Sequence, residues 1–350
     1  MLSLLDQPQR IKQFDSQNAL GVAATEPSQL GLISEIINPI SAAENDDIPK
    51  QVIVTGMGGS PLPALLAKTW LNLPVPFEII RGYDLPAYVG SQTLVIAASY
   101  SGNTEETLSA LAGAENRQAK IGVITSGGKL LEIAKTKNYP HVVLPADIQP
   151  RMTVFYGLRA LVRFFESFGM AKGKFDELGD AIDWLNQEVQ QWTADKPYGE
   201  NLAKQLAEQA VGKTTIIYAG PLMAPVAYKW KISFNENAKN VAFWNELPEF
   251  NHNEFIGWSS HPIEKPFAVF DLISSFEHPR VLKRFEVTDR LLSGMRPKAT
   301  SVQMQGDSIL KQMLWGTVLA DFVTIYLAVL NGVNPTPVDL VEKLKTELLN

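Results

Sequence analysis

Cysteine is absent from the sequence and histidine is scarce. Without cysteine the chain has no disulfide bond, no thiolate nucleophile and no cysteine-ligated zinc or iron–sulfur centre. Only four histidines occur among the 350 residues. One of them stands in His252-Asn253-Glu254, the His-x-Glu spacing of zinc deaminases, but the cysteine ligands that such a site requires are missing. We therefore expect neither a metal centre nor a cofactor.

An excess of positive charge and long apolar runs are lacking too. The net charge of −6 and the isoelectric point near 5.4 disfavour a nucleic-acid partner, since binding to a phosphate backbone normally requires a clustered basic face. No stretch approaches about 18 uninterrupted apolar residues, so we expect no membrane-spanning segment. The amino terminus lacks the basic start and the cleavage site of a secretion signal. These features predict a cytoplasmic protein.

Short apolar runs alternate with helical stretches along most of the chain. In the first half, five such runs occupy 51–55, 77–81, 93–98, 121–125 and 141–144. Near-continuous apolar runs of this length are typical of parallel strands that are buried on both faces. The second half repeats the alternation, with strands expected at 214–220, 241–244, 267–274 and 300–304. We predict an α/β fold of two doubly wound parallel-sheet domains that face each other across a cleft.

The predicted domain boundaries lie on either side of one helical segment. An apolar stripe with the spacing of a single helix face consists of Leu178, Ile182, Leu185, Val189 and Trp192. This stripe predicts one helix over 175–195, and we assign 171–198 to a linker helix. Residues 1–170, including a short helical leader, are predicted to form the N-terminal domain. Residues 199–350, with closing C-terminal helices, are predicted to form the C-terminal domain.

The turn after the first predicted strand is rich in glycine. In Gly56-Met57-Gly58-Gly59-Ser60 the glycines allow the backbone to approach a ligand, and the N-terminus of the following helix favours an anion. A dinucleotide-binding fingerprint would need a third glycine where Pro61 stands. The sequence separation of Glu78 from this turn would nevertheless suit a contact with a ribose. A tight turn without a ligand is the other alternative. This motif alone leaves the three interpretations open.

A second loop carries a more specific pattern of hydroxyl groups. Ser99-Tyr100-Ser101-Gly102-Asn103-Thr104 joins a strand to a helix and supplies three hydroxyls around one glycine. With the backbone N–H groups of the helix start, they predict a phosphate-binding loop that needs neither lysine nor metal. Helix capping would explain Thr104 alone, while Glu105 and Glu106 weigh slightly against a phosphate. Nucleotide triphosphate chemistry is not expected, because no Walker sequence occurs.

These loops resemble those of the sugar isomerase domain family. The pattern S-x-S-G-x-T-x-E-T after a strand, the earlier G-x-G-G-S and Ser126-Gly127-Gly128 all match. Over residues 50–350 the chain resembles one branch, the bifunctional phosphoglucose/phosphomannose isomerases. The segments that carry this resemblance are Gln149-Pro150-Arg151, Asn235-Glu236-Asn237-Ala238-Lys239, Asn245-Glu246-Leu247-Pro248-Glu249, Asn251-His252-Asn253-Glu254, Tyr326-Leu327-Ala328, Gly332, Asn334-Pro335 and Leu344-Lys345. The resemblance implies two sugar isomerase domains, a homodimer and a reaction without metal.

The resemblance also implies a role for individual residues. The implied phosphate ligands are Gly58, Gly59, Ser60, Ser99, Ser101 and Thr104. Glu236 is the implied base for proton transfer between carbons 1 and 2, and His252 the ring-opening group, which reaches into the neighbouring subunit's site. Arg151 is implied to stabilise the enediolate, and Lys345 to assist at the ring oxygen. Lys343 stands two positions away on another helix face, so only one of these lysines can enter the site.

Each catalytic candidate also has an ordinary structural interpretation. Glu236 and Lys239 have the spacing of a solvated ion pair on a helix. His252, flanked by asparagines, is typical of a surface turn. Arg151 could form a salt bridge between the domains. Spacing alone does not decide among these interpretations.

The expected function is the interconversion of glucose 6-phosphate, and of mannose 6-phosphate, with fructose 6-phosphate. One alternative is a narrower sugar-phosphate isomerase without mannose activity, and another is a non-catalytic sugar-phosphate sensor. Glycoside hydrolysis by Glu246, Glu249 and Glu254 is disfavoured, because the phosphate-binding loop argues for a monophosphate substrate. The preference between glucose and mannose is left open, since it depends on the space around carbon 2.

Overall fold

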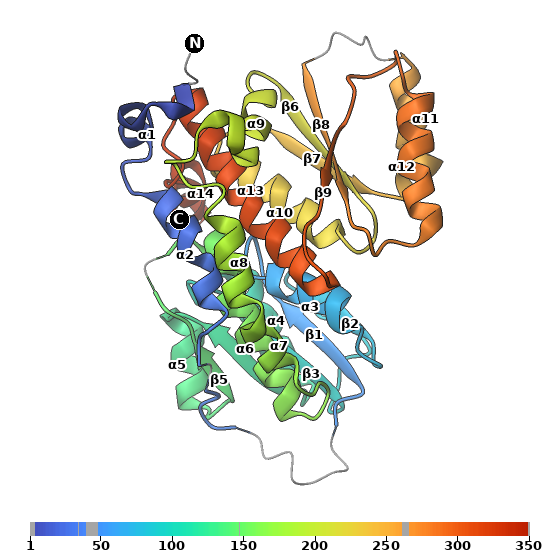
Figure 1. Cartoon of the computed structure of the whole chain (residues 1–350). Helices are drawn as coiled ribbons and strands as arrows, with labels where there is room; N and C mark the ends of the chain where they lie inside the picture. Colours follow the sequence, from blue (N-terminus) through green and yellow to red (C-terminus); the bar gives the residue numbers. More distant parts are fainter. Residues whose placement is uncertain (1–3, 34, 40–47, 147, 261–265, 349–350) are drawn as a thin grey trace. The chain divides into compact units, whose positions relative to one another are not determined.

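The chain forms two units, each with its own parallel sheet (Figure 1). The computed structural model describes residues 4–33, 35–39, 48–146, 148–260 and 266–348. We call Glu26–Trp184 the N-terminal unit, and Met1–Thr25 with Leu185–Asn350 the C-terminal unit. The prediction of two parallel-sheet α/β domains is confirmed. The predicted boundaries and the arrangement across a cleft stay predictions.

The N-terminal unit contains a five-stranded parallel sheet in the order β2-β1-β3-β4-β5. Its strands are β1 (Gln51–Thr55), β2 (Phe77–Ile80), β3 (Thr93–Ala98), β4 (Lys120–Thr125) and β5 (His141–Val143). Its helices are α3 (Leu62–Leu71), α4 (Glu105–Asn116), α5 (Gly128–Thr136), α6 (Val154–Ser167) and α7 (Lys174–Asp180), with a 3₁₀ helix, η2, at Pro150–Met152. The boundaries of this unit in the sequence fall inside two further helices, α2 (Ala19–Gln29) and α8 (Ile182–Val189).

Helices cover both faces of this sheet, and every residue of the central strand β3 is buried. On one face, Val95 and Ala97 pack with Leu111 of α4 and Ala134 of α5. On the other face the ring of Phe165, in α6, lies edge-to-face on a sheet residue, with ring centroids 5.5 Å apart. Burial on both faces is the reason that these strands appear in the sequence as near-continuous apolar runs.

The C-terminal unit contains a four-stranded parallel sheet in the order β7-β6-β8-β9. Its strands are β6 (Thr214–Ala219), β7 (Ala242–Glu246), β8 (Phe267–Ile273) and β9 (Thr300–Gln303). Its α-helices are α1 (Pro8–Phe14), α9 (Leu202–Gln209), α10 (Ala224–Glu236), α11 (Glu254–Gly257), α12 (Pro279–Leu291), α13 (Ile309–Asn331) and α14 (Asp339–Leu348). Its 3₁₀ helices are η1 (Leu4–Asp6), η3 (Tyr198–Glu200), η4 (Glu249–His252) and η5 (Trp258–Ser260).

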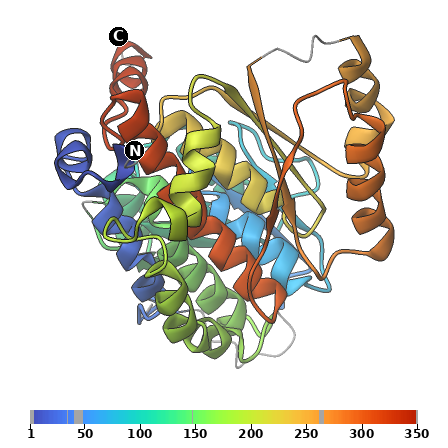
Figure 2. The same ribbon diagram turned by 45° about the horizontal axis from the view of Figure 1, so that its top comes forward.

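Figures 1 and 2 both show α12 on one face of the second sheet and α10 with α13 on the other. The alternation of side chains along β8 agrees with this arrangement. Val269 packs with Phe285 of α12, whereas the next residue, Phe270, lies 5.8 Å from Trp230 of α10, measured between ring centroids. Successive side chains of a strand point to opposite faces, so β8 supplies both layers of the core.

Helix α13 is the longest apolar segment of the C-terminal unit. Its 23 residues are long and apolar enough to cross a membrane, but 94% of its most apolar stretch is buried inside the fold. It packs on α9 and α10, and its hydroxyl residues Thr317 and Thr324 are fully buried. We therefore assign α13 as the core helix of this unit.

The N-terminal leader belongs to the C-terminal unit by its contacts. The ammonium group of Lys204, in α9, is fully buried and lies 3.0 Å from the carboxylate of Asp6 in η1. It also donates to the carbonyl oxygens of Ala194 and Lys196 at 3.1 and 2.6 Å. A buried charge with this many partners is fully compensated, so the leader is fixed to α9.

The prediction of one continuous helix over 175–195 is wrong. The segment forms two helices, α7 and α8, which meet at Ala181. Gly179 and Asp180 have low helix propensity and stand directly before this break. Leu178 and Leu185 are nevertheless both fully buried. The apolar stripe thus marked the buried side correctly but did not require an uninterrupted helix.

Candidate active site

Three strand-to-helix loops of the N-terminal unit meet at one edge of its sheet. They follow β1, β3 and β4, and parallel strands place their carboxyl ends at the same edge. A Cβ on Gly102, at φ +70°, would lie 1.8 Å from the carbonyl oxygen of Gly127. A Cβ on Gly128, at φ +66°, would lie 2.3 Å from that of Ser101. Glycine is therefore required where the second and third loops cross.

We call residues 99–104, which follow β3, the hydroxyl loop, and its serine and threonine hydroxyls are bonded within the loop. Ser99 Oγ and Thr104 Oγ1 are 2.8 Å apart, and the N–H of Gly102 donates to Ser99 Oγ at 3.1 Å. Ser101 is exposed, and its Oγ accepts a 3.4 Å bond from the N–H of Asn103. Thr104 is the N-cap residue of α4, yet its side chain makes no capping bond within the described chain. Capping alone therefore does not explain Thr104.

Tyr100 links this loop to two neighbouring segments. Its N–H donates to Ser60 Oγ in the glycine-rich turn at 3.2 Å. Its phenolic oxygen donates to the carbonyl of Pro145 at 2.8 Å and accepts from the N–H of Ile148 at 3.2 Å. Sequence reasoning missed this residue, although a lone aromatic in a loop of small polar residues was a usable signal. The bonds of Tyr100 fix the chain that leads to Arg151.

Arg151 lies directly beside the glycine-rich turn. A Cβ on Gly59 would lie 3.2 Å from both the N and the Cα of Arg151. The side chain of Arg151 is only 1% exposed, and its Nη1 donates to Gln149 Oε1 at 3.1 Å. The structure thus brings the predicted residues Gly59, Ser60 and Arg151 to the same end of the sheet as the hydroxyl loop.

A small cavity lies behind this junction. Its volume is about 20 Å³, and its lining includes Gly59, Ser60, Ser99, Tyr100 and Pro150. A cavity of this size has room for about one water molecule, which is far too little for a hexose phosphate. A sugar phosphate that binds these loops must therefore lie on their outer side.

Glu236, the last residue of α10, is half-buried. The chain after it is held by Lys239, which adopts the left-handed conformation with φ +51°. The Lys239 ammonium donates to the carbonyl oxygen of Glu236 at 2.9 Å and to those of Asn334 and Pro335 at 2.7 and 3.1 Å. Lysines often cap the last carbonyls of a helix in this way. Lys239 therefore fixes the backbone at Glu236, which the ion-pair interpretation did not foresee.

His252 is exposed at the end of η4. The side chain of its neighbour Asn251 donates to Thr288 Oγ1 at 2.9 Å and accepts from Arg284 Nη1 at 3.1 Å, both in α12. On the other side, the carboxylate of Glu254 accepts from Asn245 Nδ2 at 2.7 Å and from the hydroxyl of Tyr218. The imidazole is thus presented to the outside by a segment that is tied down before and after it.

Lys345 and Lys343 both lie on the exposed helix α14, in which no residue is buried. The ammonium of Lys345 is 2.7 Å from the carboxylate of Glu342, one turn earlier. This exposed pair contributes little to stability. Neither lysine is singled out by its surroundings, so the choice of Lys345 stays a prediction.

In the C-terminal unit, the loop after β8 carries a carboxylate, whereas the loop after β3 in the N-terminal unit carries hydroxyls. Glu277, in the loop after β8, accepts from the N–H of Leu222 in the loop after β6 at 2.8 Å. A Cβ on Gly220 would lie 2.4 Å from this carboxyl group. Burial raises the pKa of Glu277 and also that of Glu246, for which the Glu249 carboxylate adds to the rise. Within the described residues, no group of three or more acidic or histidine side chains could hold a metal ion.

The protein is similar to known sugar-phosphate enzymes over nearly its full length. A bifunctional phosphoglucose/phosphomannose isomerase from Caldicellulosiruptor bescii is 36% identical over 92% of this chain and 96% of its own. The chain belongs to the bifunctional phosphoglucose/phosphomannose isomerase family. Residues 199–348 also match the family described as the bacterial phospho-glucose isomerase C-terminal SIS domain.

One relative of this phosphoglucose/phosphomannose isomerase family member is named for a different activity. A D-glucosamine-6-phosphate 4-epimerase from Sulfolobus acidocaldarius is 38% identical over 61% of this chain and 67% of its own. Among solved structures, a glucose-6-phosphate isomerase like protein from Thermus thermophilus has a TM-score of 0.65 at 18% identity, covering 96% of this chain and 99% of that one. That likeness shows the shared fold.

Membership in the phosphoglucose/phosphomannose isomerase family confirms the resemblance that the loop motifs indicated. The predicted phosphate ligands and Arg151 meet in the N-terminal unit. Glu236, His252 and Lys345 lie on three different elements of the C-terminal unit, and their roles stay predictions. Sequence reasoning missed Asp321, a carboxylate in the middle of apolar α13. The sequence does contain a signal for this residue, because a lone acidic residue in an apolar helix must have buried partners.

Proposed function

We propose that this protein is a metal-independent isomerase that interconverts glucose 6-phosphate, and mannose 6-phosphate, with fructose 6-phosphate. The observation that carries the proposal is the Ser99–Thr104 hydroxyl pair at the N-terminus of α4, joined through Tyr100 to Ser60. Relatives named for both the glucose and the mannose reaction support the substrate class.

The hydroxyl loop suits a phosphate dianion. Ser99 and Thr104 bond each other at 2.8 Å, and a phosphate oxygen between them would replace that bond with two stronger, charge-assisted ones. The first N–H groups of α4 lack partners within the helix, and the helix dipole favours negative charge at this end. The glycine crossing of the loops keeps these donors in place before the ligand arrives. Binding then requires little rearrangement of the loop.

The chemistry after binding needs a base, an electrophile and a ring-opening group. In the proposed reaction, the carboxylate of Glu236 takes the proton from carbon 2 of the open-chain aldose and returns it to carbon 1, while the proton of the carbon-2 hydroxyl passes to the carbon-1 oxygen. The guanidinium of Arg151, which stays charged, stabilises the enediolate oxygens. Reprotonation of the same enediolate on either face of carbon 2 gives glucose or mannose 6-phosphate.

Ring opening is assigned to His252, assisted by Lys345. The imidazole takes the proton of the carbon-1 hydroxyl and delivers a proton to the ring oxygen. His252 is exposed on a segment held by Asn251 and Glu254. This outward presentation supports a homodimer in which His252 serves the site of the partner subunit.

The test is incubation of the chelator-treated protein with glucose, mannose, fructose and glucosamine 6-phosphates, each separately. We expect fructose 6-phosphate from the first two substrates and both aldoses from the third. Formation of fructose 6-phosphate from glucose 6-phosphate alone would indicate the narrower isomerase. Epimerisation of glucosamine 6-phosphate at carbon 4 would indicate the activity for which the Sulfolobus acidocaldarius relative is named. Binding of the sugar phosphates without turnover would indicate a sensor.

A further inference from the structure

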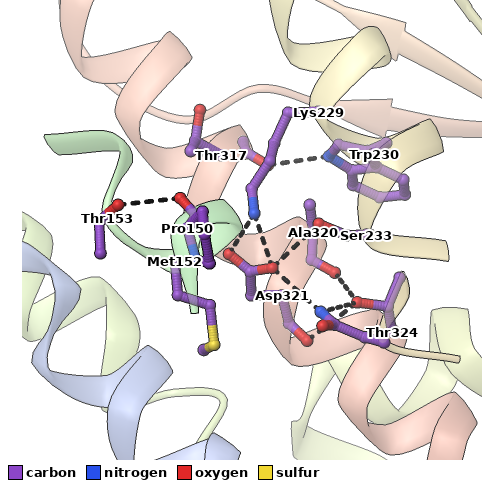
Figure 3. Close-up of polar contacts among 12 residues, drawn as sticks. Pro150, Met152, Thr153, Lys229, Trp230, Ser233, Thr317, Ala320, Asp321 and Thr324 are labelled. Carbon is purple, nitrogen blue, oxygen red and sulfur yellow. Dashed lines mark hydrogen bonds and ion pairs between the residues drawn. The ribbon is translucent and has the colours of Figure 1, made fainter. Parts of the chain in front are cut away.

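A carboxylate lies at the centre of the packing between α10 and α13. Asp321 is fully buried in α13. The ammonium of Lys229 is 2.7 Å from its carboxylate, and Ser233 Oγ and Asn237 Nδ2 donate to Oδ1 at 2.9 and 3.1 Å. Figure 3 shows Lys229 and Ser233 converging on Asp321. Lys229 and Ser233 lie in α10, and Asn237 is its C-cap residue, so a single carboxylate holds the last two turns of that helix.

The network ends at the residue next to Glu236. Asn237 also donates to Thr324 Oγ1 at 2.9 Å, and its backbone N–H donates to the carbonyl of Ser233 at 2.8 Å. Lys229 and Glu236 are seven positions apart, close to two turns, so they lie on the same face of α10. Asp321 therefore anchors α10 two turns before Glu236 and again immediately after it.

Stability alone is a poor explanation for these charges. Removing two ions from water carries a large penalty, and replacing a buried ion pair by packed apolar residues is often neutral or stabilising. The helices are already joined by other contacts: Trp230 Nε1 donates to the carbonyl oxygen of Gly316 at 2.8 Å. A buried carboxylate with three donors adds direction to this packing, because hydrogen bonds fix geometry whereas apolar contacts tolerate sliding.

We infer that Asp321 is a positioning residue for proton transfer, which sets the place of the Glu236 carboxylate through Lys229, Ser233 and Asn237. This inference rests on the proposed isomerase function and assigns that function a further residue. A base that is misplaced by about 1 Å can lose about a hundredfold in rate. Phosphate binding, in contrast, depends on loops of the N-terminal unit and should not respond.

The test uses two variants that weaken the network in different ways. Asn237→Ala removes the donor next to Glu236 and leaves the ion pair intact. Lys229→Met with Asp321→Asn removes both charges together, so no buried ion is left unpaired. The matched control is Lys204→Met with Asp6→Asn, which removes a second lysine–aspartate pair of the same unit, in which the lysine is likewise buried. Thermal unfolding identifies a temperature at which all variants are folded.

Two readouts are compared at that temperature. We expect both network variants to lose at least tenfold in kcat, while KM for fructose 6-phosphate and inhibition by inorganic phosphate stay within twofold. Amide hydrogen exchange of residues 230–240 should become faster in these variants and stay unchanged in the control. Equal kcat losses in the control, or unchanged exchange in the network variants, would overturn the positioning role. A wild-type protein without isomerase activity would overturn the proposed function instead, and the exchange result would still decide whether Asp321 orders this turn.

Discussion

At the scale of single residues, the two serines of the hydroxyl loop have different surroundings. Ser99 is 2% exposed and holds both Thr104 and the N–H of Gly102. Ser101 is exposed and accepts a long bond of 3.4 Å from the N–H of Asn103. Ser99 therefore shapes the loop in addition to its proposed contact with the ligand, whereas the proposed role of Ser101 is to bind the ligand alone.

Replacement of Ser101 by alanine should weaken phosphate binding without affecting stability. Loss of one charge-assisted bond corresponds to about 1.5–3 kcal/mol, or roughly a tenfold to hundredfold increase in the inhibition constant of inorganic phosphate. Ser99→Ala should show the same loss together with a lower melting temperature. The control is Ser167→Ala, whose hydroxyl donates to the carbonyl of Phe164 within α6. If Ser99→Ala and Ser101→Ala both bind phosphate as the wild type does, the phosphate site lies elsewhere.

The local structure of the hydroxyl loop could be predicted because its hydroxyls and glycine are adjacent in sequence, whereas its role in phosphate binding stays a prediction. The partners of the buried carboxylates could not be predicted from the sequence. Asp321 and Lys229 are 92 positions apart, and Glu277 and Leu222 are 55 apart. Composition shows only that a carboxylate in an apolar helix needs a partner. Which lysine supplies it depends on how α10 and α13 pack, and local sequence patterns do not contain that information.

Asp271 should make stability depend on pH. Burial raises the pKa of its carboxyl to about 7; Asp289 adds to this rise and Arg296 opposes it. The unfolded chain releases this proton near pH 4, so the stabilisation is complete below that pH and is lost as the pH rises toward 7. The contribution falls by about 1.4 kcal/mol per pH unit within this window.

Urea unfolding between pH 4 and pH 8 measures this effect by difference. The free energy of unfolding of the wild type minus that of Asp271→Asn should fall with rising pH across the window and become constant above about pH 7. Subtraction removes the groups that titrate in both proteins. A difference that is independent of pH would show that folding does not raise the pKa of Asp271.

At the scale of elements, the crossing of the loops after β3 and β4 depends on two glycines at positive φ. Gly102 has no room for a side chain, because its Cβ would lie 1.8 Å from a backbone oxygen of the neighbouring loop. Gly90, in contrast, has open space around the position that a Cβ would take, as far as the structure describes the chain. A comparison of Gly102→Ala with Gly90→Ala therefore distinguishes an effect on the loop crossing from a general effect of introducing alanine.

Gly102→Ala should displace the loop and impair phosphate binding. The positive φ alone is unfavourable for alanine by about 1–2 kcal/mol, and the clash forces the loop to move further. We expect the inhibition constant of inorganic phosphate to rise at least tenfold, with a lower melting temperature. Gly90→Ala should change both by little. Equal effects of the two substitutions would mean that the crossing does not shape the site.

Most elements could be predicted from sequence, because parallel strands buried on both faces leave an unbroken apolar run. β3 begins and ends at the predicted residues, Thr93 and Ala98. One element was predicted wrongly, the helix expected over 175–195, where the apolar stripe continues across the break at Ala181. Hydrophobic periodicity predicts which side of a segment is buried. It does not detect a short break between two helices when the apolar stripe continues across the break.

At the scale of the whole molecule, the proposed exchange of His252 between subunits can be tested by mixing two inactive variants. In a heterodimer of Glu236→Gln and His252→Ala, a shared arrangement gives one site with both defects and one with neither. About half of the wild-type activity per heterodimer should return after subunit exchange. If each subunit uses its own His252, both sites are damaged and no activity returns. Mass spectrometry of the intact mixture confirms that heterodimers have formed.

The central claim is that this chain transfers a proton between carbons 1 and 2 of a hexose 6-phosphate, with Glu236 as the base. The most direct measurement is proton NMR of fructose 6-phosphate incubated in D₂O with chelator-treated protein. We expect glucose and mannose 6-phosphates labelled with deuterium at carbon 2 from the wild type. Glu236→Gln, with unchanged inhibition by phosphate, should produce neither, because an amide cannot accept the carbon-bound proton. Labelled aldoses formed at the wild-type rate by Glu236→Gln, or no labelled aldose from the wild type, would contradict the account.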